Sequence, residues 1–189
     1  PAEGSSLWET CPSLAILCDP TVGDIRHDDF RTYTAADWTV TGGTPVLDSA
    51  IPGVLLFATD GTDDDTIQIQ CAAETYQLAT DKQLWYETRV YLNDVTQSDM
   101  LVGLSISDAS LIAGVSDAVY FSKSDGDASI SFTTVKDSTA TTTDTGSDMV
   151  NDTNVRLGFY FDGAGTTKAY VDGVLKATQT TNIPAEERL

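Results

Sequence analysis

The chain has 189 residues, of which 41% are hydrophobic, and 29 acidic against 10 basic residues give it a net charge of −19. This length and apolar fraction suit one globular domain and exclude wholesale disorder. The acidic surface repels phosphate groups, which excludes nucleic acid and anionic membranes as direct partners. No apolar run approaches the roughly 18 residues of a membrane-spanning helix, and none has the form of a secretory signal.

Residues 1–26 are rich in proline and cysteine and do not alternate between apolar and polar positions. We interpret them as an extended N-terminal arm that lies across the domain's own surface or across a neighbour. An ordinary strand followed by a loop is the open alternative. The arm residues expected to bury apolar area on a partner are Trp8, Leu14, Ile16 and Leu17.

Three cysteines, Cys11, Cys18 and Cys71, occur without CxxC spacing. This argues against a zinc site and against a disulfide framework. We expect reduced thiols, with Cys71 buried as a small apolar side chain. A local bridge between Cys11 and Cys18 is the alternative.

From residue 27 onward the pattern is that of short β-strands separated by turn residues, without sustained helical spacing. The predicted strands are 29–33, 37–41, 53–58, 65–71, 74–79, 83–93, 100–107, 117–123, 128–136, 154–162, 166–171 and 174–180. Residues 137–153 are expected to form a long loop with at most one weak edge strand. So many short strands bury their apolar faces best in two packed sheets. The sequence therefore predicts an all-β, two-sheet antiparallel jelly-roll sandwich over residues 27–189.

The clearest strands lie between residues 154 and 178. Four apolar residues from Val155 to Phe161 alternate with polar or small ones, the period of a strand with one buried face. Asp172-Gly173 then supplies a type I′ hairpin turn, because glycine accepts a positive φ.

Alternation assigns one face of each strand to the core, and a bulge would shift that assignment by one residue. The expected core residues are Phe57, Ile67, Ile69, Leu84, Tyr86, Val90, Leu92, Leu101, Gly103, Val119, Phe121, Ile130, Phe132, Leu157, Phe159, Phe161, Tyr170 and Val174.

Several segments follow one another in the order of a known pattern. They are LWYETRVYL (84–92), MLVGLSIS (100–107), DAVYFSKSDGDASISF (117–132), VNDTNVRLGFYFDG (150–163) and KAYVDGVL (168–175). Together they resemble the concanavalin A-like lectin/glucanase (LamG-type) jelly roll of tailed-bacteriophage virion proteins. The resemblance implies a capsid decoration protein without enzymatic activity. Two features depart from it: the chain stops at Leu189, where similar proteins run on into another strand, and the arm carries no matching motif.

The residues themselves also argue against catalysis. A glycoside hydrolase of this fold class needs two closely spaced carboxylates, yet Glu87 stands alone and a pair with Arg89 on the same strand face is the simpler interpretation. The single histidine, His27, lies in an acidic segment without a G-x-S-x-G motif, which also argues against a transition-metal site. We therefore expect no catalytic residues.

Calcium is the cofactor that the sequence suggests. Carboxylate oxygens, which Ca²⁺ prefers, cluster at Asp60, Asp63, Asp64 and Asp65. The resemblance to LamG-like jelly rolls, which bind Ca²⁺ at loop tips, favours a site there. A solvated turn is the alternative, since no EF-hand spacing occurs.

The sequence thus predicts a non-enzymatic structural protein on the outer surface of a tailed-phage capsid, assembled in the host cytoplasm. Its expected partners are the major capsid protein and neighbouring copies of itself in a homo-oligomer. Deleting residues 1–26 is expected to abolish capsid binding and leave the sandwich folded. The alternative is a lectin-like carbohydrate-binding adhesin of the same fold, with Trp38, Trp85, Tyr76 and Tyr120 as candidate sugar platforms.

Overall fold

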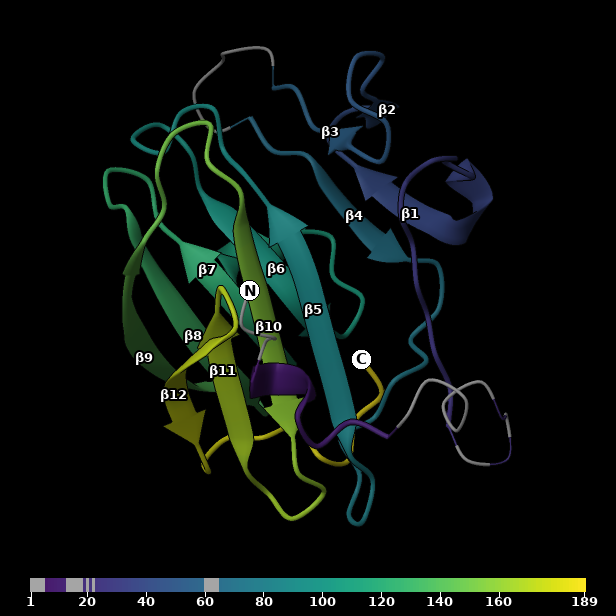
Figure 1. The fold of residues 1–189 in the computed structure, drawn as a ribbon, viewed down its shortest axis with the longest axis vertical. Coiled ribbons are helices and arrows are strands. Elements are labelled where there is room, and N and C mark those ends of the chain that lie inside the picture. Colours follow the sequence, from purple (N-terminus) through teal and green to yellow (C-terminus); the bar gives the residue numbers. More distant parts are fainter. Residues whose placement is uncertain (1–5, 13–18, 20, 22, 60–64) are drawn as a thin grey trace. The chain divides into compact units, whose positions relative to one another are not determined.

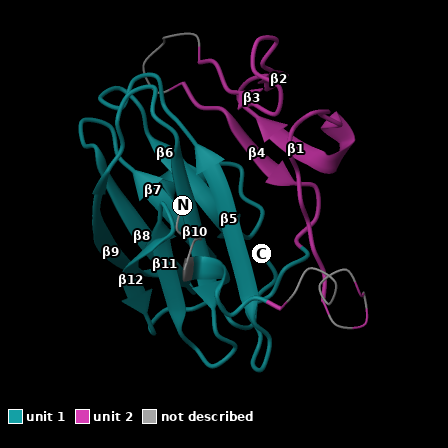
Figure 2. Ribbon diagram, in the orientation of Figure 1, with its two compact units in different colours: residues 1–11, 75–189 teal, residues 12–74 magenta. Residues whose placement is uncertain are grey.

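The computed structural model describes residues 6–12, 19, 21, 23–59 and 65–189 (Figure 1). The chain divides into two compact units, residues 1–11 with 75–189 and residues 12–74 (Figure 2). The first unit is therefore discontinuous: the chain leaves it after Cys11 and re-enters it at Thr75. This division differs from the predicted boundary at residue 26, and the role of residues 1–26 as an arm stays a prediction.

The first unit is built from two four-stranded antiparallel sheets. One has the order β12-β11-β10-β5, with β5 (Leu84–Val90), β10 (Val155–Phe161), β11 (Thr167–Val171) and β12 (Val174–Gln179). The other has the order β6-β7-β8-β9, with β6 (Met100–Ser105), β7 (Ala118–Lys123), β8 (Ser129–Lys136) and β9 (Thr139–Asp148).

The inner faces of these sheets form one apolar core, so the predicted two-sheet sandwich is confirmed. The ring centroids of Phe132 on β8 and Phe159 on β10 lie 6.0 Å apart and join the sheets. The predicted core residues that are fully buried here are Val119, Phe121, Ile130, Phe132, Leu157, Phe159 and Phe161. Strict alternation on these strands gave the sequence its clearest signal.

Several core assignments were wrong. On β6 the side chains that pack against the core are those of Met100, Val102 and Leu104, one residue out of step with the predicted Leu101 and Gly103. Because this strand is apolar at almost every position, alternation could not choose its buried face.

Phe57 and Val174 were also expected inside, but their side chains are 44% and 57% exposed. Tyr170 is buried as expected, although it lies on the outer face of its sheet, in a separate cluster with Leu7 and Tyr160.

Strand β9 occupies residues that were expected to form mostly a loop. Its ten residues pair antiparallel with β8 over most of their length. They are threonine, serine and aspartate in large part, so no apolar period marks them. The strand forms because β8 provides hydrogen-bonding partners for its backbone. The sequence of one strand does not show which partner it will have.

A buried glutamine links the two sheets through polar contacts. Gln179 of β12 is 4% exposed, and its Nε2 donates to the carbonyl oxygen of Phe132 at 3.0 Å. Its Oε1 accepts from the Thr134 hydroxyl at 2.8 Å. Buried polar atoms at this edge of the core are thereby satisfied.

The predicted hairpin turn between β11 and β12 is present. Asp172 and Gly173 adopt positive φ values of 51° and 81°, as a type I′ turn requires. The Asp172 carboxylate also accepts a hydrogen bond from the Arg156 backbone N–H at 2.9 Å.

The C-terminal residue pairs with the point where the chain re-enters the first unit. The carbonyl oxygen of Leu189 accepts hydrogen bonds from the backbone N–H groups of Thr75 and Tyr76 at 3.2 and 3.1 Å. The Leu189 N–H in turn donates to the Tyr76 carbonyl at 2.7 Å.

The second unit, residues 12–74, contains two two-stranded sheets. They pair β1 (Trp38–Thr41) with β4 (Gln68–Cys71) and β2 (Val46–Leu47) with β3 (Leu55–Leu56). The helices described in the chain are short 3₁₀ turns: η1 (Ser6–Trp8), η2 (Ala35–Asp37) and η3 (Leu111–Ala113). None of the helices in the described residues is long and apolar enough to cross a membrane.

Candidate functional site

The predicted arm residues fall partly outside the described part of the chain. Leu14, Ile16 and Leu17 lie outside it, together with Cys18. Trp8 is 41% exposed, and its indole Nε1 donates to the Glu87 carboxylate at 3.3 Å.

The arm residue that the sequence did not single out is Leu7. Its side chain is 1% exposed and packs with Tyr160, Tyr170 and Trp85 on the outer face of the β5–β10–β11 sheet. Gly158 makes room for it, because a Cβ at that position would stand 2.5 Å from Leu7 Cδ2. A glycine inside a strand often marks such a close approach, so Gly158 was the feature of the sequence that could have indicated this contact.

The expected ion pair between Glu87 and Arg89 is not present among the described residues. The Glu87 carboxylate faces the Trp8 indole instead, while Arg89 stands opposite Arg156 on β10. Glu87 therefore helps to hold η1 against the sheet.

The calcium prediction is not tested by the structure. Asp65 is described and exposed, whereas Asp60, Asp63 and Asp64 lie outside the described residues. Within the described part of the chain, no group of three or more His, Cys, Asp or Glu side chains could hold a metal ion. A Ca²⁺ site in this loop stays a prediction.

The cysteines give no metal or disulfide chemistry in the described residues. Cys11 and Cys71 are free and half-buried. Burial raises the pKa of the Cys11 thiol above its usual range, which favours the protonated thiol over the nucleophilic thiolate.

The first candidate binding surface is the β2–β3 hairpin of the second unit. We call the exposed side chains of Val46, Leu47, Ile51 and Phe57 the hairpin surface; they are 50%, 39%, 54% and 44% exposed. Successive residues of a strand point to opposite faces. Val46 and Leu47 are both exposed, so each face of this hairpin has an apolar side chain in contact with solvent, while Leu55 and Leu56 opposite them are half-buried.

The second unit offers these residues no core of its own. In the described part of residues 12–74, no large hydrophobic side chain is buried. The ring of Trp38, its largest side chain, is half-buried and lies 5.9 Å from Phe30. An isolated hairpin is marginal in water, and exposed apolar side chains on it make it a candidate interaction surface.

Charge is one-sided in the sequence of the second unit. Residues 12–74 contain eleven acidic residues, and their only Lys or Arg residues are Arg26 and Arg31. The Arg26 guanidinium lies 4.7 Å from the centre of the Trp38 ring. Arg31 pairs with Asp29 at 3.1 Å. Both cations are thus engaged within the unit.

The second candidate surface is the outer face of the β6–β9 sheet, which we call the hydroxyl face. Its side chains alternate with the core residues of the same strands. Opposed residues form three rows: Gly103–Tyr120–Thr133–Thr142, Leu101–Ser122–Ser131–Asp144 and the more apolar Ser105–Ala118–Val135–Ala140. The hydroxyl oxygens of Thr133 and Thr142 lie 2.9 Å apart and share a hydrogen bond.

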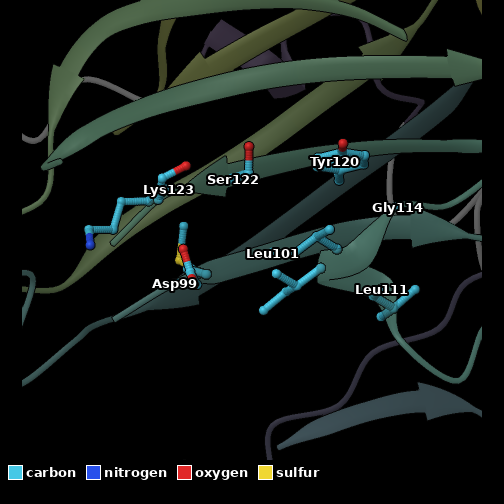
Figure 3. A pocket seen from close by; sticks show the side chains of 10 residues that line it. Asp99, Leu101, Leu111, Gly114, Tyr120, Ser122 and Lys123 are labelled. Carbon is cyan, nitrogen blue, oxygen red and sulfur yellow. The ribbon is translucent and has the colours of Figure 1, made fainter. Parts of the chain in front are cut away.

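A hollow of about 160 Å³ opens at one end of the hydroxyl face. The side chains of Leu101, Tyr120 and Ser122 line it from the sheet, and Leu111 of η3 lines it from the loop (Figure 3). The hollow therefore offers an apolar wall beside two hydroxyl groups. Such a mixture suits a polar ligand with an apolar face.

Tyr120 is the aromatic group of this hollow. Burial raises the pKa of its hydroxyl above the usual range, and a hydrogen bond with Thr133 acts in the opposite direction. The hydroxyl is neutral at physiological pH and can both donate and accept.

Two of the other predicted sugar platforms, Trp85 and Trp38, pack against neighbouring side chains, and the third, Tyr76, is half-buried. Trp85 packs beneath Leu7 with Tyr160, and Trp38 lies between Phe30 and Arg26.

Comparison with known proteins supports the fold and does not give a family. No family model matches the chain, and no curated protein matches it. Among solved structures, it is similar to the carbohydrate binding module CBM66 from Bacillus subtilis, with a TM-score of 0.52 and 15% identity. The similarity covers 80% of this chain and 84% of that one. It confirms the jelly-roll sandwich, while the phage context of the predicted family has no support from it.

Proposed function

We propose that the protein is a non-enzymatic structural protein of a tailed-phage virion, bound to the major capsid protein on the outer capsid surface. The hairpin surface carries the proposal, because its uncovered apolar side chains need another protein to bury them. The motifs between residues 84 and 175 that resemble phage virion proteins supply the choice of partner. The sandwich is then the stable body of a cementing protein.

The attachment site in this proposal differs from the arm of residues 1–26. Leu7 is buried against the sandwich, so deleting the arm would remove a packing residue along with any contact to a partner. That deletion cannot separate binding from folding. The exposed residues of the hairpin surface can be changed without opening a cavity.

The test is co-sedimentation with capsids that lack this protein. The variant Val46→Ser/Phe57→Ser changes two exposed side chains, and we expect it to bind at least about tenfold more weakly than the wild type. The matched control Val150→Ser/Val174→Ser changes side chains of 60% and 57% exposure in the first unit and should bind normally. Wild-type protein that stays in the supernatant would contradict the proposal.

Carbohydrate binding is the second candidate function, and the hollow beside Tyr120 favours it. A sugar can place its apolar face against Leu101 and Leu111 while its hydroxyls reach Tyr120 and Ser122. The similar fold of a carbohydrate binding module is consistent with this proposal. Because the chain carries a net charge of −19, the ligand would be a neutral saccharide.

A glycan array with neutral and anionic saccharides tests the second candidate. Saturable binding of a neutral glycan should weaken about tenfold in Tyr120→Phe, which removes one hydrogen-bonding hydroxyl and keeps the ring. Tyr91→Phe, a half-buried tyrosine that follows β5, is the matched control. Absence of binding to every glycan would remove this candidate and leave the first intact.

A further inference from the structure

We infer that the hairpin surface docks against an apolar protein surface bordered by lysine and arginine, and not against a second copy of this chain. The inference rests on the proposed function, because it names the chemistry of the partner at the same site. It follows from the shape of the hairpin and from the charges beside it.

The hairpin is prebuilt for docking. Asp48 closes its turn, since its carboxylate accepts hydrogen bonds from the N–H groups of Ala50 and Ile51 at 2.7 and 3.1 Å. The backbone N–H of Asp48 donates to the Val54 carbonyl at 2.9 Å. Ile51 is thereby held at the tip with 54% of its side chain exposed. A loop fixed before binding loses little entropy when it binds.

Acidic residues border this hairpin. The carbonyl oxygen of Asp29 lies 2.9 Å from where a Cβ of Gly53 would stand, so residues 28 and 29 run beside the turn. Asp28 holds this segment by accepting a hydrogen bond from the Phe30 N–H at 2.8 Å. Asp48 adds a further carboxylate within the hairpin itself.

The second unit has few cations to complement a second copy, although the side chain of one of them, Arg31, is 77% exposed. Arg26 and Arg31, the only Lys or Arg residues of positions 12–74, are engaged with Trp38 and Asp29. Two copies meeting at this surface would bring like charges together, which costs association free energy. A partner with an apolar centre and a basic rim instead matches both the exposed side chains and their border.

The test uses two synthetic amphipathic peptides with the same leucine face, one with lysine and one with glutamate on the polar face. Binding to the full-length protein is measured by fluorescence anisotropy at low and high salt. We expect the lysine peptide to bind at least about tenfold more tightly than the glutamate peptide at low salt. Its affinity should fall as salt rises, because the border charges are screened.

Two variants separate the apolar and charged parts of the surface. Val46→Ser/Phe57→Ser should weaken the lysine peptide at every salt concentration, while Val150→Ser/Val174→Ser should not. Asp28→Asn/Asp48→Asn keeps the oxygen acceptors that hold the loop and removes two charges. It should flatten the salt dependence and leave the melting temperature unchanged.

Several outcomes would overturn the inference. Equal affinity for the two peptides would contradict the inferred basic rim of the partner. Unchanged peptide binding by Val46→Ser/Phe57→Ser would contradict its inferred apolar centre. Sedimentation equilibrium showing a dimer that this variant dissolves would make a second copy the occupant.

The peptide assay contains no capsid, so it stands apart from the test of the proposed function. Peptide preference without capsid binding would refute the virion proposal and keep this inference. Capsid binding that is insensitive to salt and to Asp28→Asn/Asp48→Asn would support the virion proposal and contradict this inference.

Discussion

The Leu7 side chain can approach strand β10 closely because residue 158 is a glycine. Leu7→Ala should lower the free energy of unfolding by about 2–4 kcal/mol, since it empties a buried site that the sheet cannot fill. Urea denaturation measures the loss. Wild-type stability in this variant would mean that η1 contributes nothing to the fold.

Gly158→Ala probes the same contact from the opposite side. Its Cβ would crowd Leu7 Cδ2 at 2.5 Å and the Tyr86 carbonyl at 2.8 Å, so we expect it to destabilise the protein as well. The double variant should lose less than the sum of the two single losses, because alanine at position 7 removes one of the two clashes. Strict additivity would show that the two residues do not interact.

Gln179 is the second residue whose replacement has a defined effect. Gln179→Leu leaves the Phe132 carbonyl without its Nε2 donor, at a cost of about 2–3 kcal/mol in unfolding free energy. Thr134 is less affected, because its single hydroxyl proton can be donated instead to the Thr181 carbonyl, which lies 2.9 Å away. A gain in thermal stability would show that the polar link between the sheets is dispensable.

Among the elements, the turn between β10 and β11 offers a matched pair of glycines. Gly163 and Gly165 have positive φ values of 75° and 95°, but only Gly163 is crowded, with Lys82 N 2.9 Å from its would-be Cβ. Gly165→Ala should cost about 1–2 kcal/mol from backbone strain alone. Gly163→Ala should cost more, and equal losses in urea denaturation would show that the turn does not pack on residues 81–82.

The same turn contributes to the acid stability of the sandwich. Burial acts to raise the pKa of Asp162, but hydrogen bonds from the backbone N–H groups of Thr166 and Ala164 outweigh it and hold the pKa below its usual range. A lowered pKa stabilises the fold above the unfolded value of about 3.9. That stability is lost as the pH falls through the lower, folded value.

Asp162→Asn should therefore melt at a lower temperature than the wild type at pH 7. Its melting temperature should also decline less steeply between about pH 5 and pH 2, where carboxyl groups titrate. Differential scanning calorimetry across this range compares the two. Parallel pH profiles would show that the Asp162 charge does not hold the turn.

For the whole molecule, the net charge of −19 acts against the compact state through self-repulsion. Added salt screens exposed charges over a Debye length of about 8 Å at physiological ionic strength. The melting temperature should therefore rise between low and high sodium chloride. A falling melting temperature would indicate that attractive charge pairs outweigh the repulsion.

How much of the fold could be predicted follows from what each strand shows on its own. Strand β10 alternates from Val155 to Phe161, and its buried face was correct. Strand β6 is apolar on both faces, so the sequence did not show which face is buried. Strand β9 is polar, so it was predicted to be mostly a loop.

The candidate sites were harder to predict, since exposure is a property of the assembled chain. Phe57 was assigned to the core by strand alternation, yet its unit has no large hydrophobic side chain buried in the described residues. The hydroxyl face required the pairing of Tyr120 with Thr133 and of Thr133 with Thr142. No local pattern contains those pairs.

The discontinuity of the first unit has a mechanical consequence. A pull on the hairpin reaches the sandwich along two covalent connections, through Cys11 and through Thr75. Beside the first connection, a buried Leu7 side chain resists the force, and beside the second, backbone hydrogen bonds to Leu189 resist it. Force applied to residues 12–74 is therefore shared between an apolar contact and a set of backbone hydrogen bonds. If one of these attachments breaks, the other still connects residues 12–74 to the sandwich.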